Sequence, residues 1–338
     1  MELKEAYIEE IMCHHFSIDP SRCLVNSGTM DLSMLDTNVL KDFFIKPFAS
    51  VKTEFCFSHP VDLSYNVVYQ TVLKIVQNGD FVKCSQDIYH QLQASSTQPS
   101  IKDGDVFIAK ITDIIHNDTY YEGLGIFKIE RKSEFIETYL DEDGNMQFAI
   151  KNGFASNKLD KACLIVLEDK MPKCLIIDTN NDTKFWRQDF LGLVPKPNAY
   201  SQSKAAMQVF QSFVKDELSV RKEMPKDEQV GLINNWTEQV KNSDSVEIDS
   251  LAKEIFANDG LSEAFSDYCK AFEKKEGMSL AGNIRIDKKA VTVPKKVRTI
   301  KLDDTVEIIF IKTCNYIERG FDESRGMNYY KLFFTKEK

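Results

Sequence analysis

Two stretches in the first 95 residues show helical spacing of apolar positions. In VDLSYNVVYQTVLKIVQN (61–78), Leu63, Val67, Val68, Thr71 and Ile75 fall on one side of a helix. CSQDIYHQLQ (84–93) continues with the same period. The pattern therefore predicts helical structure through most of residues 61–93.

Beyond residue 104 the period changes to short β-rich runs separated by turn residues. The links are short, as in DEDGN at 141–145, and parallel strands need crossovers of a dozen residues or more. Residues 105–187 are therefore predicted to form a largely antiparallel sheet. Its strands are DVFIAKITDII, YYEGLGIFKIE, EFIETYL, MQFAIK, ACLIVLE and KCLIIDT.

The helical period returns at SQSKAAMQVFQSFVKDEL (201–218), for which Ser201 or Ser203 is a suitable N-cap. Three shorter amphipathic helices follow, in PKDEQVGLINNWTEQV, VEIDSLAKEIFAN and SEAFSDYCKAFEKK. From residue 283 the chain reverts to strands. VRTIKL and TVEIIFI predict a hairpin, and NYYKLFF (328–334) predicts a third strand.

These elements indicate an α+β protein. We expect a mixed N-terminal domain with a central antiparallel sheet (1–197), a helical middle region (198–282) and a small C-terminal β unit (283–338). The chain is long enough for such a division. Its start shows no secretory signal, and no apolar run is long enough to span a membrane, so a cytoplasmic protein is expected.

Motifs for catalysis and metal binding are missing from the sequence. The eight cysteines occur singly, which argues against a disulfide framework or a zinc site. The run 178–182 resembles the start of a calcium loop but lacks the glycine at position six, so Asx turns explain it better. His14 and His15 are adjacent and point in different directions, which favours structural roles. No catalytic residue, metal ligand or cofactor is predicted; an enzyme would need groups that only the fold brings together.

Charge is distributed unevenly. The whole chain carries −9, whereas residues 285–301 hold seven basic residues and one acid, a local charge of +6. At physiological ionic strength the Debye length is about 8 Å, so distant acids scarcely weaken such a patch. The segment is therefore the candidate site for a polyanion.

Several stretches resemble the bacterial nucleoid-associated protein family NdpA/YejK. They are YHQLQASSTQPSIKDGDVFIAKITDII, EGLGIFKIERKSEFIE, NKLDKACLIVLED, FWRQDFLGL, IKLDDTVEIIFI and GMNYYKLFF. The resemblance implies a protein that accompanies the bacterial chromosome and binds DNA. It implies no catalytic residues and assigns no DNA contacts.

The residues predicted to contact DNA therefore come from charge alone, and the expected binding has little sequence specificity. They are Lys288, Lys289, Lys295, Lys296, Arg298 and Lys301. Six phosphate contacts would give a log–log salt slope of roughly −5. On a strand, however, Lys295 and Lys301 would face away from Lys296 and Arg298 unless a bend intervenes at Pro294.

Two other interpretations remain open. The lysines could protect an edge strand from sheet-to-sheet aggregation. Alternatively, the acidic helices within 215–276, with fifteen acids and nine bases, could recruit the protein to the nucleoid through a protein partner.

Overall fold

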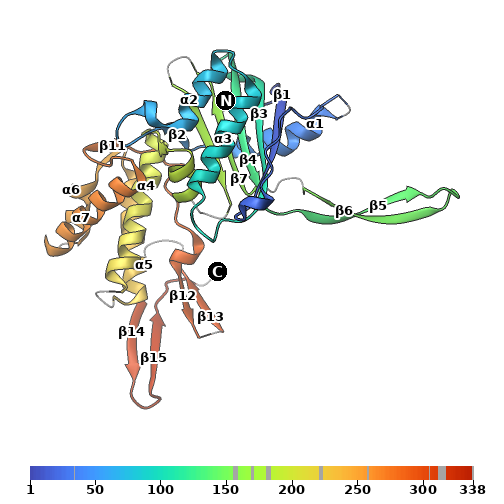
Figure 1. Ribbon diagram of the computed structural model, residues 1–338. Coiled ribbons are helices and arrows are strands. Elements are labelled where there is room, and N and C mark those ends of the chain that lie inside the picture. Colours follow the sequence, from blue (N-terminus) through green and yellow to red (C-terminus); the bar gives the residue numbers. More distant parts are fainter. Residues whose placement is uncertain are drawn as a thin grey trace. The chain divides into compact units, whose positions relative to one another are not determined.

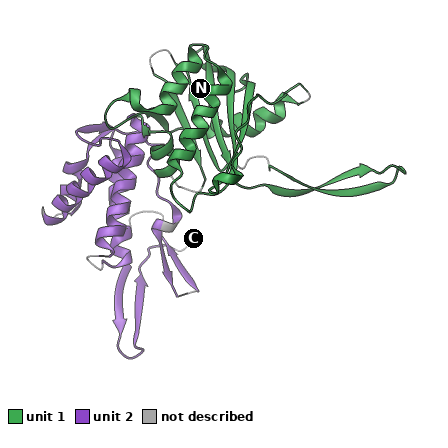
Figure 2. Cartoon of the chain, viewed as in Figure 1, with its two compact units in different colours: residues 1–196 green, residues 197–338 purple. Residues whose placement is uncertain are grey.

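The computed structural model describes residues 1–33, 35–154, 159–168, 171–179, 184–220, 224–256, 259–303, 305–310 and 317–336. The chain divides into two compact units, Met1–Lys196 and Pro197–Lys338 (Figure 2). Sheets and helices are both substantial and the strand pairing is antiparallel, so the predicted α+β class is confirmed.

The first unit is built on a seven-stranded antiparallel sheet with the strand order β1-β3-β4-β7-β8-β2-β9 (Figure 1). Its strands are β1 (Tyr7–Phe16), β2 (Glu54–Phe57), β3 (Gly104–His116), β4 (Thr119–Ile129), β7 (Lys161–Val166), β8 (Lys173–Asp178) and β9 (Leu193–Pro195). The strands predicted at 105–187 are present, but only four of them, β3, β4, β7 and β8, belong to this sheet. The two predicted within 133–153 form a separate two-stranded ladder, so their assignment to the sheet is wrong. Strand β1, which the sequence did not predict, pairs with β3 at the edge of the sheet.

Short and long helices cover the two faces of this sheet. One face packs against α2 (Val67–Val76) and α3 (Phe81–Ser95), which bury residues such as Val72 and Ile88 against Ile126. The opposite face packs against α1 (Thr37–Leu40) and the turns that follow, where Phe44 and Phe48 meet Phe127. The remaining short helices of the unit are η1 (Pro20–Arg22), η2 (Lys41–Ile45), η3 (Lys46–Ser50), η4 (Leu63–Tyr65) and η5 (Lys184–Phe190).

A long hairpin of β5 (Ser133–Leu140) and β6 (Met146–Gly153) leaves the sheet between β4 and β7 (Figure 1). It turns at the predicted DEDGN segment, where Gly144 adopts a left-handed φ of 80°. Every residue of β5 is exposed. The hairpin therefore adds nothing to the core of its own unit.

The second unit has a helical core. It contains α4 (Ala199–Phe213), η6 (Val214–Leu218), α5 (Lys226–Asn242), α6 (Ile248–Phe256) and α7 (Asp259–Glu276). Phe210 stacks on Trp236 with ring centroids 4.2 Å apart. The cap of α4 differs from prediction: Asn198 is the N-cap, and Ser201 completes a capping box because it hydrogen-bonds back to the backbone of Asn198.

The strands of the second unit form three separate two-stranded ladders. They are β10 (Ser245–Glu247) with β11 (Asn283–Arg285), β12 (Thr299–Leu302) with β13 (Val306–Ile309), and β14 (Ile317–Asp322) with β15 (Met327–Leu332). The predicted hairpin is β12–β13. The predicted third strand does not join it, because β15 pairs with the unpredicted strand β14.

The C-terminal ladders are anchored on α5. Val230 of α5 is fully buried against Ile300 and Phe310, and the Tyr330 hydroxyl donates to Asp227 Oδ1 at 3.2 Å. The division of residues 197–338 into a helical region and a β unit remains a prediction.

Candidate nucleic-acid interface

The basic segment begins at Arg285, the last residue of β11, and continues into a loop whose backbone is held from both sides. The N–H of Ile286 donates to the carbonyl of Asp244 at 2.9 Å, and the N–H of Asp287 donates to Ser203 Oγ at 2.9 Å. Ile286 and Ala290 are buried, whereas Lys288 and Lys289 between them are exposed. The buried flanks fix the loop, so both lysines point into solvent.

A bend does intervene at Pro294. Pro294 is the N-cap of a 3-10 helix, η7 (Lys295–Arg298), and the N–H of Val297 donates to the Pro294 carbonyl at 3.0 Å. Proline has a fixed φ and suits the start of a helical turn. The alternation expected for a strand therefore does not apply at 295–298, and the split of the charges between two faces, expected only without such a bend, does not follow there.

The six predicted DNA contacts have different surroundings. Lys288, Lys289, Lys295 and Lys301 are exposed, and Arg298 is half-buried. The side chain of Lys296 lies outside the described residues. These positions occupy three consecutive elements: the loop after β11, the turn η7 and strand β12.

Carboxylates already neutralise part of the charge. Lys288 Nζ lies 3.6 Å from Asp244 Oδ1, and Lys301 Nζ lies 3.1 Å from Glu307 Oε1. Exposed pairs of this kind contribute only about 0–1 kcal/mol, so a phosphate can displace either carboxylate. For Lys289 and Lys295, the described residues provide no carboxylate within ion-pair distance.

The adjacent histidines His14 and His15 lie in β1 of the first unit. His14 is buried, and its Nδ1 accepts the N–H of Asn26 at 3.1 Å. Its proton therefore sits on Nε2, which lies 2.8 Å from Ser85 Oγ. A general base would have to accept the serine proton. Here the imidazole donates to the hydroxyl, so this pair is not an activated nucleophile.

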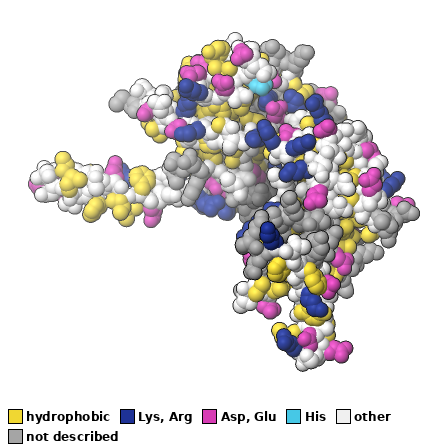
Figure 3. Space-filling view, turned by 180° about the vertical axis from the view of Figure 1, so that it is seen from behind, with side chains coloured by type: hydrophobic (Ala, Val, Ile, Leu, Met, Phe, Trp, Pro, Cys, Tyr) yellow, Lys and Arg dark blue, Asp and Glu magenta, His cyan; other side chains and the backbone are white. Residues whose placement is uncertain are grey.

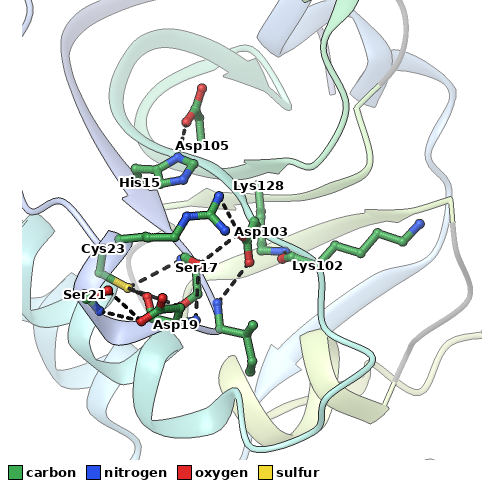
Figure 4. A network of polar contacts seen from close by, with 11 residues as sticks. His15, Ser17, Asp19, Ser21, Cys23, Lys102, Asp103, Asp105 and Lys128 are labelled. Atoms are coloured by element: carbon green, nitrogen blue, oxygen red, sulfur yellow. Dashed lines mark hydrogen bonds and ion pairs between the residues drawn. The ribbon is translucent and has the colours of Figure 1, made fainter.

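His15 belongs to a network at the end of β1 (Figure 4). Its Nδ1 lies 2.6 Å from Asp105 Oδ1, and Lys132 Nζ lies 2.7 Å from the other oxygen of that carboxylate. Nearby, Asp103 accepts from Ser17 Oγ at 2.9 Å and from the N–H of Ile18 at 3.0 Å. These bonds tie the loop after β1 to the start of β3, which is a structural role.

Among the described residues there is no group of three or more His, Cys, Asp or Glu placed to hold a metal ion. Asp178, the first residue of the calcium-like run, lies 3.1 Å from Lys161 Nζ. Residues 180–182 of that run lie outside the described residues.

A comparison with protein-family models shows which family the chain belongs to. The family model described as nucleoid-associated protein YejK matches residues 35–320. The chain belongs to this family. The resemblance seen in the sequence is thus confirmed, and it places the protein among nucleoid-associated proteins. A search of curated proteins gave no match. No helix in the described part of this family member combines the length and apolar content that crossing a bilayer requires.

Proposed function

We propose that the protein binds duplex DNA through phosphate contacts from the basic segment 285–301, with little sequence specificity. The observation that carries the proposal is the fixed loop after β11, in which buried Ile286 and Ala290 hold Lys288 and Lys289 in solvent. Membership of a nucleoid-associated family supports it. Lysine ammonium groups contact phosphates as point charges and do not read bases.

Salt dependence follows from the number of contacts. Four exposed lysines, Lys288, Lys289, Lys295 and Lys301, would release about four counterions, so the log–log salt slope should lie between about −3 and −4. This is shallower than the slope expected for all six basic positions. The smaller value counts neither Arg298, which is half-buried, nor Lys296, whose side chain lies outside the described residues.

The test is fluorescence anisotropy with duplexes of unrelated sequence, measured across a salt series. The triple variant Lys288→Glu, Lys289→Glu, Lys295→Glu should lose most of its affinity at low salt. A control with the same number of charge reversals at exposed lysines elsewhere on the second unit, Lys215→Glu, Lys253→Glu and Lys270→Glu, should bind nearly as tightly as wild type.

Two results would speak against direct contact. Equal losses for the triple variant and the control would mean that only net charge matters. No binding by wild type even at low salt would favour recruitment by a protein partner through the acidic helices 215–276.

A further inference from the structure

The β5–β6 hairpin is amphipathic although it lies outside the core. Side chains of directly opposite residues point to the same face of a two-stranded ladder. The pairs Ile136↔Ile150 and Thr138↔Phe148 alternate with Phe135↔Lys151 and Glu137↔Ala149. The hairpin therefore has two chemically distinct faces.

One face is almost entirely apolar. Its large side chains are 64–78% exposed, and they follow one another without interruption by charge from Ile136 to the turn. They are Ile136, Leu140, Met146, Phe148 and Ile150. The other face is mixed and includes an ion pair in which Lys151 Nζ lies 3.4 Å from Glu137 Oε2. Figure 3 shows hydrophobic side chains in a row along this hairpin, which extends to the left in that view.

An uncovered apolar face of this size needs an explanation. A two-stranded hairpin alone is at best marginally stable in water and gains stability when its hydrophobic face is packed. The five side chains expose on the order of 700 Å², which exceeds most patches on monomeric proteins and is close to the ~800 Å² that each partner contributes to a standard interface. We therefore expect this face to be buried in the functional assembly.

The charge of the hairpin limits what can cover it. Residues 133–153 hold five acids and one lysine, so the hairpin repels a nucleic acid backbone. Three of the acids, Asp141, Glu142 and Asp143, lie in the turn. Arg131 and Lys132 lie at the opposite end of the hairpin. Their side chains are 66% and 50% exposed although they form ion pairs with Asp160 and Asp105. The hairpin is thus acidic at its tip and basic at its base.

We propose that the apolar face of β5–β6 packs on the same face of a second copy of this chain, with the two hairpins antiparallel. In that arrangement each acidic turn lies over Arg131 and Lys132 of the other copy, and the apolar rows cover each other. The contact uses the same surface twice, so a two-fold axis closes it as a dimer. A parallel arrangement would place the two acidic turns together, which electrostatic repulsion disfavours.

The first experiment measures self-association of the full chain by sedimentation equilibrium over a range of protein concentrations. Ile150→Glu places a charge in the centre of the apolar face and should raise the dimer dissociation constant at least tenfold. The matched control is Tyr139→Glu, which replaces an exposed apolar side chain by the same charge on the opposite face of the hairpin. It should leave the dissociation constant nearly unchanged. Thermal melting of both variants checks that the fold is retained.

A second experiment tests the antiparallel packing of the two hairpins by disulfide cross-linking. Thr138 lies in the middle of the apolar face, so Thr138→Cys in two antiparallel hairpins should form an intermolecular disulfide under mild oxidation. Glu137→Cys, one residue away on the other face, should cross-link no more than wild type, which sets the background from the native cysteines.

Three results would overturn the proposal. They are a monomer at every concentration tested, a dimer that Ile150→Glu leaves intact, and equal cross-linking of the two cysteine variants. The last two would assign the contact to another surface.

Discussion

His14 Nε2 donates a hydrogen bond to Ser85 Oγ across 2.8 Å, and both residues are buried between β1 and α3. The direction of this bond is fixed because Nδ1 of the same ring accepts the N–H of Asn26. The ring thus joins β1 to the loop at Asn26 and to α3, which lies 71 residues further along the chain. It does so only while it is neutral, because protonation would place a second donor against the N–H of Asn26.

Stability should therefore fall in mild acid. Burial lowers the pKa of His14 from 6.5 to about 4, with a smaller contribution from His90. Between these pH values His14 is protonated in the unfolded chain but neutral in the folded protein. The free energy of unfolding therefore decreases as the pH falls from 6.5 to 4. The total loss should be about 3 kcal/mol.

Urea denaturation at several pH values measures this loss. His14→Gln cannot titrate, so it should be less stable at pH 7 and lose the slope between pH 6.5 and 4. His59→Gln, at a histidine far from this site in the sequence, should keep the slope. An unchanged slope in His14→Gln would assign the acid sensitivity to other groups.

The buried ion pair of Lys128 and Glu130 should be costly to break. Their side chains are 0% and 3% exposed, with Lys128 Nζ 2.8 Å from Glu130 Oε1. Lys128 Nζ also lies 2.6 Å from the Lys102 carbonyl; both lysines are labelled in Figure 4. Burial lowers the pKa of Lys128, and Glu130 opposes that effect. Glu130→Ala removes the partner of a buried charge and should destabilise the protein by about 3–5 kcal/mol.

The same urea assay tests this. Glu137→Ala removes the partner of an exposed pair in the same unit and should cost less than about 1 kcal/mol. Similar costs for the two substitutions would show that water reaches Lys128.

Two glycines should respond oppositely to alanine. A Cβ at Gly125 in β4 would lie 2.4 Å from the ring of Phe127, so Gly125→Ala forces that buried ring to move and should destabilise the protein by about 1–3 kcal/mol. Gly231 lies within α5 with no atom within 4 Å of such a Cβ. Gly231→Ala should stabilise the protein by about 0.5–1 kcal/mol. Thermal melting compares the two variants. A change of the melting temperature in the same direction for both would contradict the prediction.

Single lysines in the basic segment should each account for about one counterion. Lys289 is exposed, and none of the described carboxylates pairs with it. Lys289→Ala should weaken DNA binding uniformly across sequences and reduce the salt slope by about 1. Lys215→Ala, at an exposed lysine of η6, should leave the slope as it is. A change that depended on DNA sequence would indicate base contacts instead.

Local periodicity in the sequence predicted most elements correctly, and the misses have physical causes. Strand β1 went unrecognised because YIEEIMCHHF mixes charges with apolar residues, and its pairing with β3 spans about ninety positions. The sequence predicts a strand from Val297, whereas the 3-10 turn η7 extends to Arg298 because Pro294 starts a helical turn. The sequence predicts Ser201 or Ser203 as the N-cap of α4, but the N-cap is Asn198, because Asn198 and Ser201 together form a capping box.

The candidate DNA site also combines features that the sequence predicts with features that depend on the fold. Its cationic composition was evident from the residues alone, but the exposure of each lysine depends on which neighbours the helices bury.

For this protein, the order of apolar and polar residues determined four of the seven strands of the antiparallel sheet, the helices of the second unit and the position of the positive charge, because these depend on neighbours along the chain. Only the tertiary structure decided that His14 donates to Ser85, that carboxylates pair with Lys288 and Lys301, and that the β5–β6 hairpin leaves an apolar face uncovered. Those features depend on contacts between residues distant in sequence, and a one-dimensional pattern does not contain them.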